Sequence, residues 1–169
     1  MSYTRRVEEI GPGEKFSKLG TEFTEPDLVS FLSYGLECRI IRHPTLLSLC
    51  GYVRVPATNH FFGKHYNDPS LESVCVHGGL TFAGNSLPEE PTKPGEYEAH
   101  GGFDMANRGW WFGFDCGHYL DIVPGLEVYT HFRRFVPRSA SLPEATYKPI
   151  EYVTEHCELL ASQLAFGSP

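Results

Sequence analysis

Three stretches of the chain alternate apolar and polar side chains with the two-residue period of a β-strand. Residues 36–56 form the first, and His43-Pro44-Thr45 divides it into two arms, which predicts a β-hairpin. One face of its second arm is apolar and consists of Leu47, Leu49, Gly51, Val53 and Val55. The opposite face carries Tyr52 and Arg54, and Pro56 ends the arm.

Residues 108–121 contain both tryptophans of the chain and turn from dense aromatics to polar groups within two positions. Because successive side chains of a strand point to opposite faces, one face here is formed by Trp110, Phe112 and Phe114. The other face is formed by Trp111, Gly113 and Asp115. A large ring, a missing side chain and a carboxylate leave room for a flat molecule against the backbone. We expect the first face in the core and the second at the floor of a ligand pocket.

Residues 73–83 form the third alternating stretch, with Val74, Val76, Gly78, Leu80 and Phe82 on one predicted face. The other predicted face contains Cys75, His77, Gly79, Thr81 and Ala83. If this strand neighbours the strand around Asp115, Gly79 and Gly113 together make a depression, and Trp111 offers a wall for stacking. The predicted ligand-binding residues are His77, Gly79, Thr81, Trp111, Gly113, Asp115, Tyr52 and Arg54.

Helical patterns occur at two places. Thr24 can cap a helix over residues 25–34, with Asp27 as the second member of the capping pair in its first turn. An apolar stripe of Leu28, Phe31 and Leu32 follows before Gly35. Near the carboxyl end, Pro149 precedes apolar residues at helical spacing, which are Ile150, Val153, Cys157, Leu160 and Leu164. We predict an α+β fold, in which this C-terminal amphipathic helix packs on an antiparallel β-sheet that is connected by long loops.

The length of 169 residues fits one domain, residues 1–169, with a core of its own. Residues 1–22 predict a loosely held arm, which could reach a partner subunit in a homo-oligomer. Residues 84–108 are rich in proline, glycine and acidic residues and predict a long loop, either a flap over the pocket or a solvated loop. Residues 126–136 fit a strand or a short helix.

Charge and cysteine content narrow the function classes. The formal net charge of −7 argues against binding duplex nucleic acid, but a small anionic ligand needs only two or three local donors. Five scattered cysteines without a C-x-x-C pair indicate neither a disulfide framework nor a zinc ribbon. The polar amino-terminal residues and the lack of a run of roughly 20 apolar residues predict a soluble, cytoplasmic protein that binds no membrane. No cofactor is indicated.

The candidate chemistry lies on His77, Asp115 and His118, and three uses of these side chains stay open. The first is binding alone, by directional hydrogen bonds in an apolar cleft. The second is hydrolysis, with His77 or His118 as general base, Asp115 or Asp121 as its orienting carboxylate, and Cys116 as an optional nucleophile. The third is a divalent metal site. Alternatively these residues are structural, with Asp115 closing a turn through its side chain.

Several motifs resemble those of a family of small, uncharacterised phage and bacterial proteins. They are Gly51-Tyr-Val-Arg-Val-Pro56, Val76-His-Gly-Gly-Leu-Thr81 and Trp110-Trp-Phe-Gly-Phe-Asp-Cys-Gly-His118, and the similarity covers residues 50–165. By analogy with small phage proteins that counter host defence, the resemblance implies a role in the host cytoplasm on nucleotide second messengers. We therefore expect the protein to bind and sequester a small nucleotide-like ligand, or alternatively to cleave one as a hydrolase or phosphodiesterase.

Overall fold

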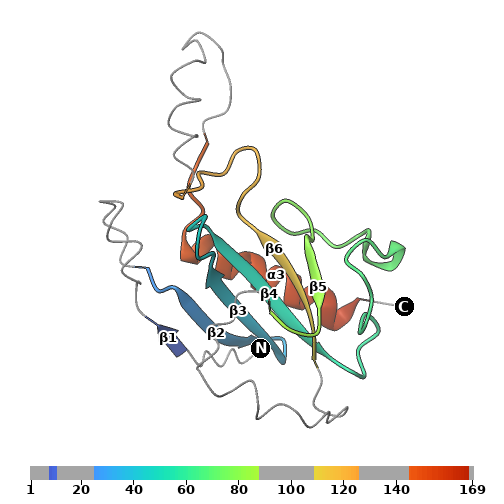
Figure 1. The fold of residues 1–169 in the computed structure, drawn as a ribbon. Helices are drawn as coiled ribbons and strands as arrows, with labels where there is room; N and C mark the ends of the chain where they lie inside the picture. Colours follow the sequence, from blue (N-terminus) through green and yellow to red (C-terminus); the bar gives the residue numbers. More distant parts are fainter. Residues whose placement is uncertain (1–7, 11–24, 88–108, 126–144, 168–169) are drawn as a thin grey trace.

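The computed structural model describes residues 8–10, 25–87, 109–125 and 145–167. They form an antiparallel sheet in the order β1-β2-β3-β4-β6-β5 and a helix, α3, that packs against β4, β3 and β2 (Figure 1). The elements are β1 (Glu8–Ile10), β2 (Leu28–Ser33), β3 (Leu36–Arg42), β4 (Leu49–Pro56), the short 3-10 helix η1 (Pro69–Leu71), β5 (Phe82–Gly84), β6 (Gly109–Asp115) and α3 (Ile150–Phe166). The predicted α+β fold with a helix on an antiparallel sheet is confirmed.

The hairpin of residues 36–56 is confirmed as β3 and β4, which pair with Ile40 opposite Gly51. Its turn lies at the predicted break, where His43 Nδ1 accepts hydrogen bonds from the N–H groups of Thr45 and Leu46. Leu47 completes the connection with a φ of 60°. The side chain of His43 thus replaces ladder hydrogen bonds that the turn removes.

The predicted helix over 25–34 is wrong, because residues 28–33 are the strand β2. Val29 and Phe31, which are two positions apart as in a strand, are buried in the core. The predicted helical stripe of Leu28, Phe31 and Leu32 is not buried together, because Leu32 is exposed. Tyr34 and Gly35 follow with φ of 51° and 76°, which is the two-residue geometry that joins twisted antiparallel strands. β2 pairs with β3 along its whole length and with β1 over residues 28–30.

The predicted strand over 73–83 is also largely wrong. Only residues 82–84 form a strand, β5, and the preceding residues form a loop. Gly78 and Gly79 have φ of 66° and 80°, a left-handed conformation that no strand contains. Side chains of α3 hold this loop instead, as Gln163 accepts from Cys75 N–H and donates to Cys75 O at 2.7 and 2.8 Å.

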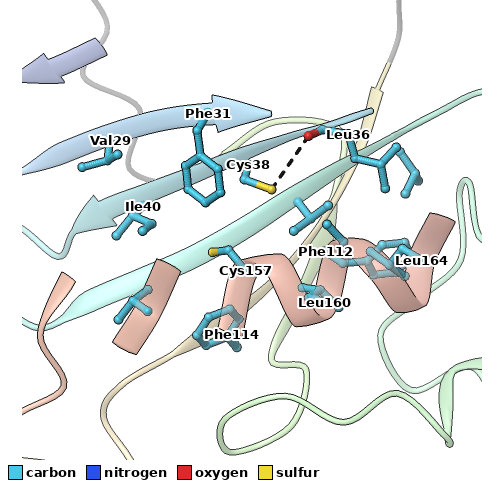
Figure 2. Packing of buried hydrophobic residues seen from close by; sticks show 14 of the residues in the cluster. Val29, Phe31, Leu36, Cys38, Ile40, Phe112, Phe114, Cys157, Leu160 and Leu164 are labelled. Atoms are coloured by element: carbon cyan, nitrogen blue, oxygen red, sulfur yellow. Dashed lines mark hydrogen bonds between the residues drawn. The ribbon is translucent and has the colours of Figure 1, made fainter. Parts of the chain in front are cut away.

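The main core lies between the sheet and α3, as Figure 2 shows for Cys157, Leu160 and Leu164 opposite Phe112 and Phe114. The two predicted faces of β6 are confirmed, since Trp110, Phe112 and Phe114 belong to this core and Trp111 packs on the opposite face of the sheet. On that second face Trp111 packs with Ile41, Cys50, Tyr52 and Leu87.

The C-terminal helix is confirmed from Ile150 to Phe166, with Pro149 and Gly167 at its ends. Pro149 offers no capping side chain, and the carboxylate of Glu25 takes that role by accepting from Ile150 N–H at 2.9 Å. Glu25 also accepts from the Tyr147 hydroxyl at 2.8 Å. A residue that lies just before β2 therefore caps the start of the helix.

Some predictions fall on residues outside those that the structure describes. They concern the arm over 1–22 apart from β1, most of the flap over 84–108, and the segment 126–136. Within the described ranges, no helix combines the length and apolarity that crossing a membrane requires.

Candidate functional site

The loop before β5 places His77 beside α3, where its backbone N–H and both of its ring nitrogens have hydrogen-bond partners. Its backbone N–H donates to His156 Nδ1 at 3.0 Å, its Nε2 lies 2.7 Å from Asp121 Oδ2, and its Nδ1 lies 2.8 Å from Tyr152 Oη. The ring of His118 is 5.6 Å away, centroid to centroid. We call His77, His118, Asp121, Tyr152 and His156 the histidine centre.

Asp121 is the anchor of the histidine centre, with only 1% of its surface exposed. Its Oδ2 also accepts from His118 N–H at 3.0 Å, and its Oδ1 lies 3.2 Å from Lys148 Nζ. Burial alone would raise the pKa of this carboxyl, but the bonds from His77 and His118 and the nearby Lys148 lower it overall. Asp121 is therefore an ionised acceptor at neutral pH.

The ionisation of Asp121 fixes where protons sit on its neighbours. A carboxylate only accepts, so His77 Nε2 carries a hydrogen, and in the neutral imidazole Nδ1 accepts from the Tyr152 hydroxyl. Burial, then the proximity of Cys116 and Asp121, raises the pKa of Tyr152 and keeps that hydroxyl protonated. Burial and the proximity of His77 lower the pKa of His156, which stays neutral and accepts through Nδ1.

His118 connects the centre to Asp115, because its Nε2 lies 3.5 Å from Asp115 Oδ1. This nitrogen is buried and takes part in no hydrogen bond among the described residues. Gly78 lies directly against the imidazole, so that a Cβ at this position would overlap it. The three predicted catalytic residues, His77, Asp115 and His118, are thus brought together around Gly78, and Asp115 also closes a turn by accepting from Gly117 N–H at 2.9 Å.

A cavity of about 310 Å³ is lined in part by Asp115 and Gly117, and Asp115 connects it to His118 of the histidine centre. Tyr52 and Phe82 form part of its wall, with their rings edge to face and 5.6 Å apart. Three predicted ligand-binding residues, Tyr52, Thr81 and Asp115, line it. Its other described lining residues are His43, Leu46, Ser48, Cys50, Phe82, Phe114 and Gly117.

The predicted floor of two adjacent glycines needs correction. The space above Gly113 is filled by the ring of Tyr52, the residue opposite it in the β4–β6 register, so that no ligand can lie there. Gly79 lies in the loop, where a Cβ would have open space around it and the positive φ of 80° explains the glycine. What shapes the cavity is the tyrosine that fills the gap.

Three other predicted ligand-binding residues, Trp111, Arg54 and His77, are not among the residues that line this cavity. Trp111 packs on the open face of the sheet with the Arg39 guanidinium 5.2 Å from its ring. Arg54 lies against Gly109 and pairs with Glu37 at 3.3 Å. His77 faces α3. Trp111 is therefore not the stacking wall of the cavity that the structure shows.

Tyr152 and His156 are site residues that the sequence reasoning missed. They stand four positions apart on α3, and their rings stack at 4.5 Å. That spacing, beside the apolar stripe, was the available signal. Cys116, considered as a nucleophile, is 2% exposed, and burial together with Asp121 raises its pKa, so it remains a thiol.

The divalent metal that the sequence left open finds no support in the described ranges, where no group of three or more histidine, cysteine or acidic side chains is placed to hold an ion. Comparison of the chain with protein-family models, with curated proteins and with solved structures finds no match.

Proposed function

We propose that this protein is a hydrolase that cleaves a small nucleotide-like molecule and uses the histidine centre for acid–base catalysis. The observation that carries the proposal is the 2.7 Å contact between His77 Nε2 and the buried carboxylate of Asp121. A carboxylate in this position holds an imidazole in one tautomer and stabilises the imidazolium that forms when it takes a proton.

The cavity supports a ligand with a flat apolar part and a polar end. Its volume of about 310 Å³ is at the small end of ligand sites, and Tyr52 and Phe82 give it aromatic walls. Its polar lining includes His43, Ser48, Thr81 and Asp115. Of these, Asp115 lies 3.5 Å from His118 of the histidine centre. A nucleoside base fits the apolar part, and the phosphate ester of the same molecule is then directed toward His118.

Sequestration without cleavage is the second candidate, and the cavity is the observation that favours it. A concave site with aromatic walls and a few polar groups can bind a ligand with no chemistry at all. In that case the histidine centre serves to hold the loop at residues 73–81 on α3. The two candidates differ in whether His77 is needed for turnover or only for the shape of the loop.

One experiment separates the two candidates. The protein is incubated with a panel of cyclic and linear nucleotides, and product formation and the melting temperature are both recorded. Products that disappear in His77→Ala, with a loss of about 10²–10⁴ in rate as is usual for a general base, support the hydrolase. His60→Ala, which removes an exposed histidine far from the centre, is the matched control and keeps full activity.

The other outcomes are equally decisive. A melting shift without products, lost in Thr81→Val and in Asp115→Asn, supports sequestration and overturns the hydrolase. Neither products nor a shift with any member of the panel overturns both candidates.

A further inference from the structure

His77 has no free ring nitrogen, which constrains how it can take part in a reaction. Its Nε2–H is bound to Asp121 and its Nδ1 to the Tyr152 hydroxyl, at 2.7 and 2.8 Å. A base that takes a proton directly from water or substrate needs an unoccupied lone pair. As the site stands, His77 can withdraw a proton only from Tyr152.

Hydrogen bonds join Tyr152 to His77 and His77 to Asp121, which is the order of a nucleophile, a base and an orienting carboxylate. We call these three side chains the relay. Such an arrangement is recognised by geometry, with the nucleophile in hydrogen-bond contact with the base and the base in contact with an acid. Tyr152 is partly exposed, whereas Asp121 is buried, so the hydroxyl end of the relay is the end that a substrate can reach. Lys148 Nζ lies 5.6 Å from the centre of the Tyr152 ring and supplies positive charge beside it.

The relay is also held rigidly before any ligand arrives. Tyr152 lies on α3, a helix of 17 residues, and the loop that carries His77 is bonded to the same helix through His156 and Gln163. Donor and acceptor therefore keep their distance without help from substrate, as covalent catalysis requires.

On this basis, and resting on the hydrolase proposed above, we infer that Tyr152 is the nucleophile and forms a transient tyrosyl phosphoester with a phosphodiester or phosphoanhydride substrate. The Tyr152 O–H proton passes to His77 Nδ1 while the phenolic oxygen bonds to phosphorus. The bond between phosphorus and the leaving oxygen breaks, and that oxygen takes the electron pair and the Nδ1 proton. Water then gives a proton to His77 and bonds to phosphorus, the Tyr152–phosphorus bond breaks, and the tyrosine oxygen recovers the proton.

A reactive probe tests this inference without knowledge of the substrate. The full chain is treated with an adenosine ester of 4-(fluorosulfonyl)benzoic acid, whose sulfonyl fluoride is attacked by a phenol oxygen with loss of fluoride and of the phenolic proton. Adducts are located by intact mass and peptide mapping. Tyr119, which is 76% exposed, serves as the reference tyrosine within the same molecule.

We expect Tyr152 to be labelled at least about 10-fold faster than Tyr119, a threshold set below the roughly 10²–10⁴-fold that a positioned base contributes. Burial raises the pKa of Tyr152, which works against its labelling. His77→Gln should remove the advantage and leave Tyr119 unchanged. Labelling of Tyr152 at or below the rate of Tyr119 in the wild-type chain overturns the inference, and this comparison needs no variant to fold.

Turnover experiments keep this inference separate from the function on which it rests. Tyr152→Phe keeps the ring on His156 and removes only the hydroxyl, so it should abolish cleavage while the melting temperature stays within a few degrees. If the wild-type chain cleaves a nucleotide and Tyr152→Phe does so equally well, the nucleophile is wrong and the hydrolase stands. If Tyr152 shows fast His77-dependent labelling but no nucleotide is cleaved, the relay stands and the substrate class is wrong.

Discussion

The contact between Gly78 and His118 gives the sharpest test of how the histidine centre is built. Gly78 has a φ of 66°, and a Cβ there would overlap the His118 imidazole. Gly79 has a similar φ of 80°, but a Cβ at that position meets no atom within 4 Å. Replacing each glycine by alanine therefore imposes the same kind of backbone strain, and only the first replacement adds a steric clash.

The two costs can be worked out separately. The left-handed conformation costs a residue with a Cβ about 1–2 kcal/mol, and this applies to both variants. Overpacking adds about 1–3 kcal/mol, of which we expect the lower end, because the His118 side chain is 33% exposed and can swing outward. Gly78→Ala should thus be about 1 kcal/mol less stable than Gly79→Ala, or about 2–4 °C lower in melting temperature.

The assay is urea unfolding followed by the fluorescence of the two tryptophans, with the histidine ring resonances recorded by NMR. The resonances of His118 should move in Gly78→Ala and stay in place in Gly79→Ala. Adding His118→Ala to Gly78→Ala removes the clash, so a double-mutant cycle should recover the difference of about 1 kcal/mol as a coupling energy. Equal stability of the two glycine variants, or an unmoved His118, would refute the packing of Gly78 on the imidazole.

Three further predictions concern the core, the helix start and pH. Leu160→Ala should lower the free energy of unfolding by about 2–5 kcal/mol, because the side chain is fully buried against the sheet. Leu159→Ala, at a side chain that is 43% exposed on the same helix, should change it by no more than about 0.5 kcal/mol in the same denaturation assay. Equal costs would contradict the orientation of α3. Glu25→Gln should lower the free energy of unfolding by about 1–2 kcal/mol, because it weakens the cap of α3 and removes an ion pair with Arg42, whereas Glu151→Gln, at an exposed first-turn acid, should cost only a few tenths. The reverse order would be inconsistent with the cap. The pKa of His156 is lowered in the folded chain, so the unfolded chain takes up the proton first as the pH falls. The contribution of neutral His156 to stability is therefore complete above about pH 6.5 and is lost as the pH falls toward the folded-state pKa. The melting temperature of His156→Asn should depend less on pH, and an unchanged acid sensitivity would argue against the lowered pKa of His156.

Local patterns predicted those elements whose signals lie within their own segment. The β3–β4 hairpin, the two faces of β6 and the full extent of α3 follow from periodicity, turn residues and end signals that lie within each segment. The helix predicted over residues 25–34 was wrong because the segment fits two patterns. Leu28, Phe31 and Leu32 have helical spacing, whereas Val29 and Phe31 have the spacing of a strand. Pairing with β1 and β3, which no local pattern contains, decided between the two periods.

The candidate site was only partly predictable for the same reason. His77, Asp115 and His118 were chosen from residue type and came together, since Asp115 and His118 are neighbours in sequence and His77 reaches them through the Gly78 turn. The residues that complete the centre, Tyr152 and His156, follow His77 by 75 and 79 positions. Contacts of that separation depend on where α3 docks.

The sequence by itself determined which glycines and aromatic residues of β4 and β6 share a face, because alternation along a strand and side-chain size are local properties. Only the tertiary structure decided what fills the gaps: register places Tyr52 over Gly113 and Phe114 against Gly51, where a Cβ would come within 2.5 Å of the ring. In the sequence, a glycine beside a polar residue is equally consistent with open space for a ligand and with space that an aromatic ring of the protein fills. Cross-strand pairing and the docking of α3 settle that choice, since close packing leaves space for one occupant.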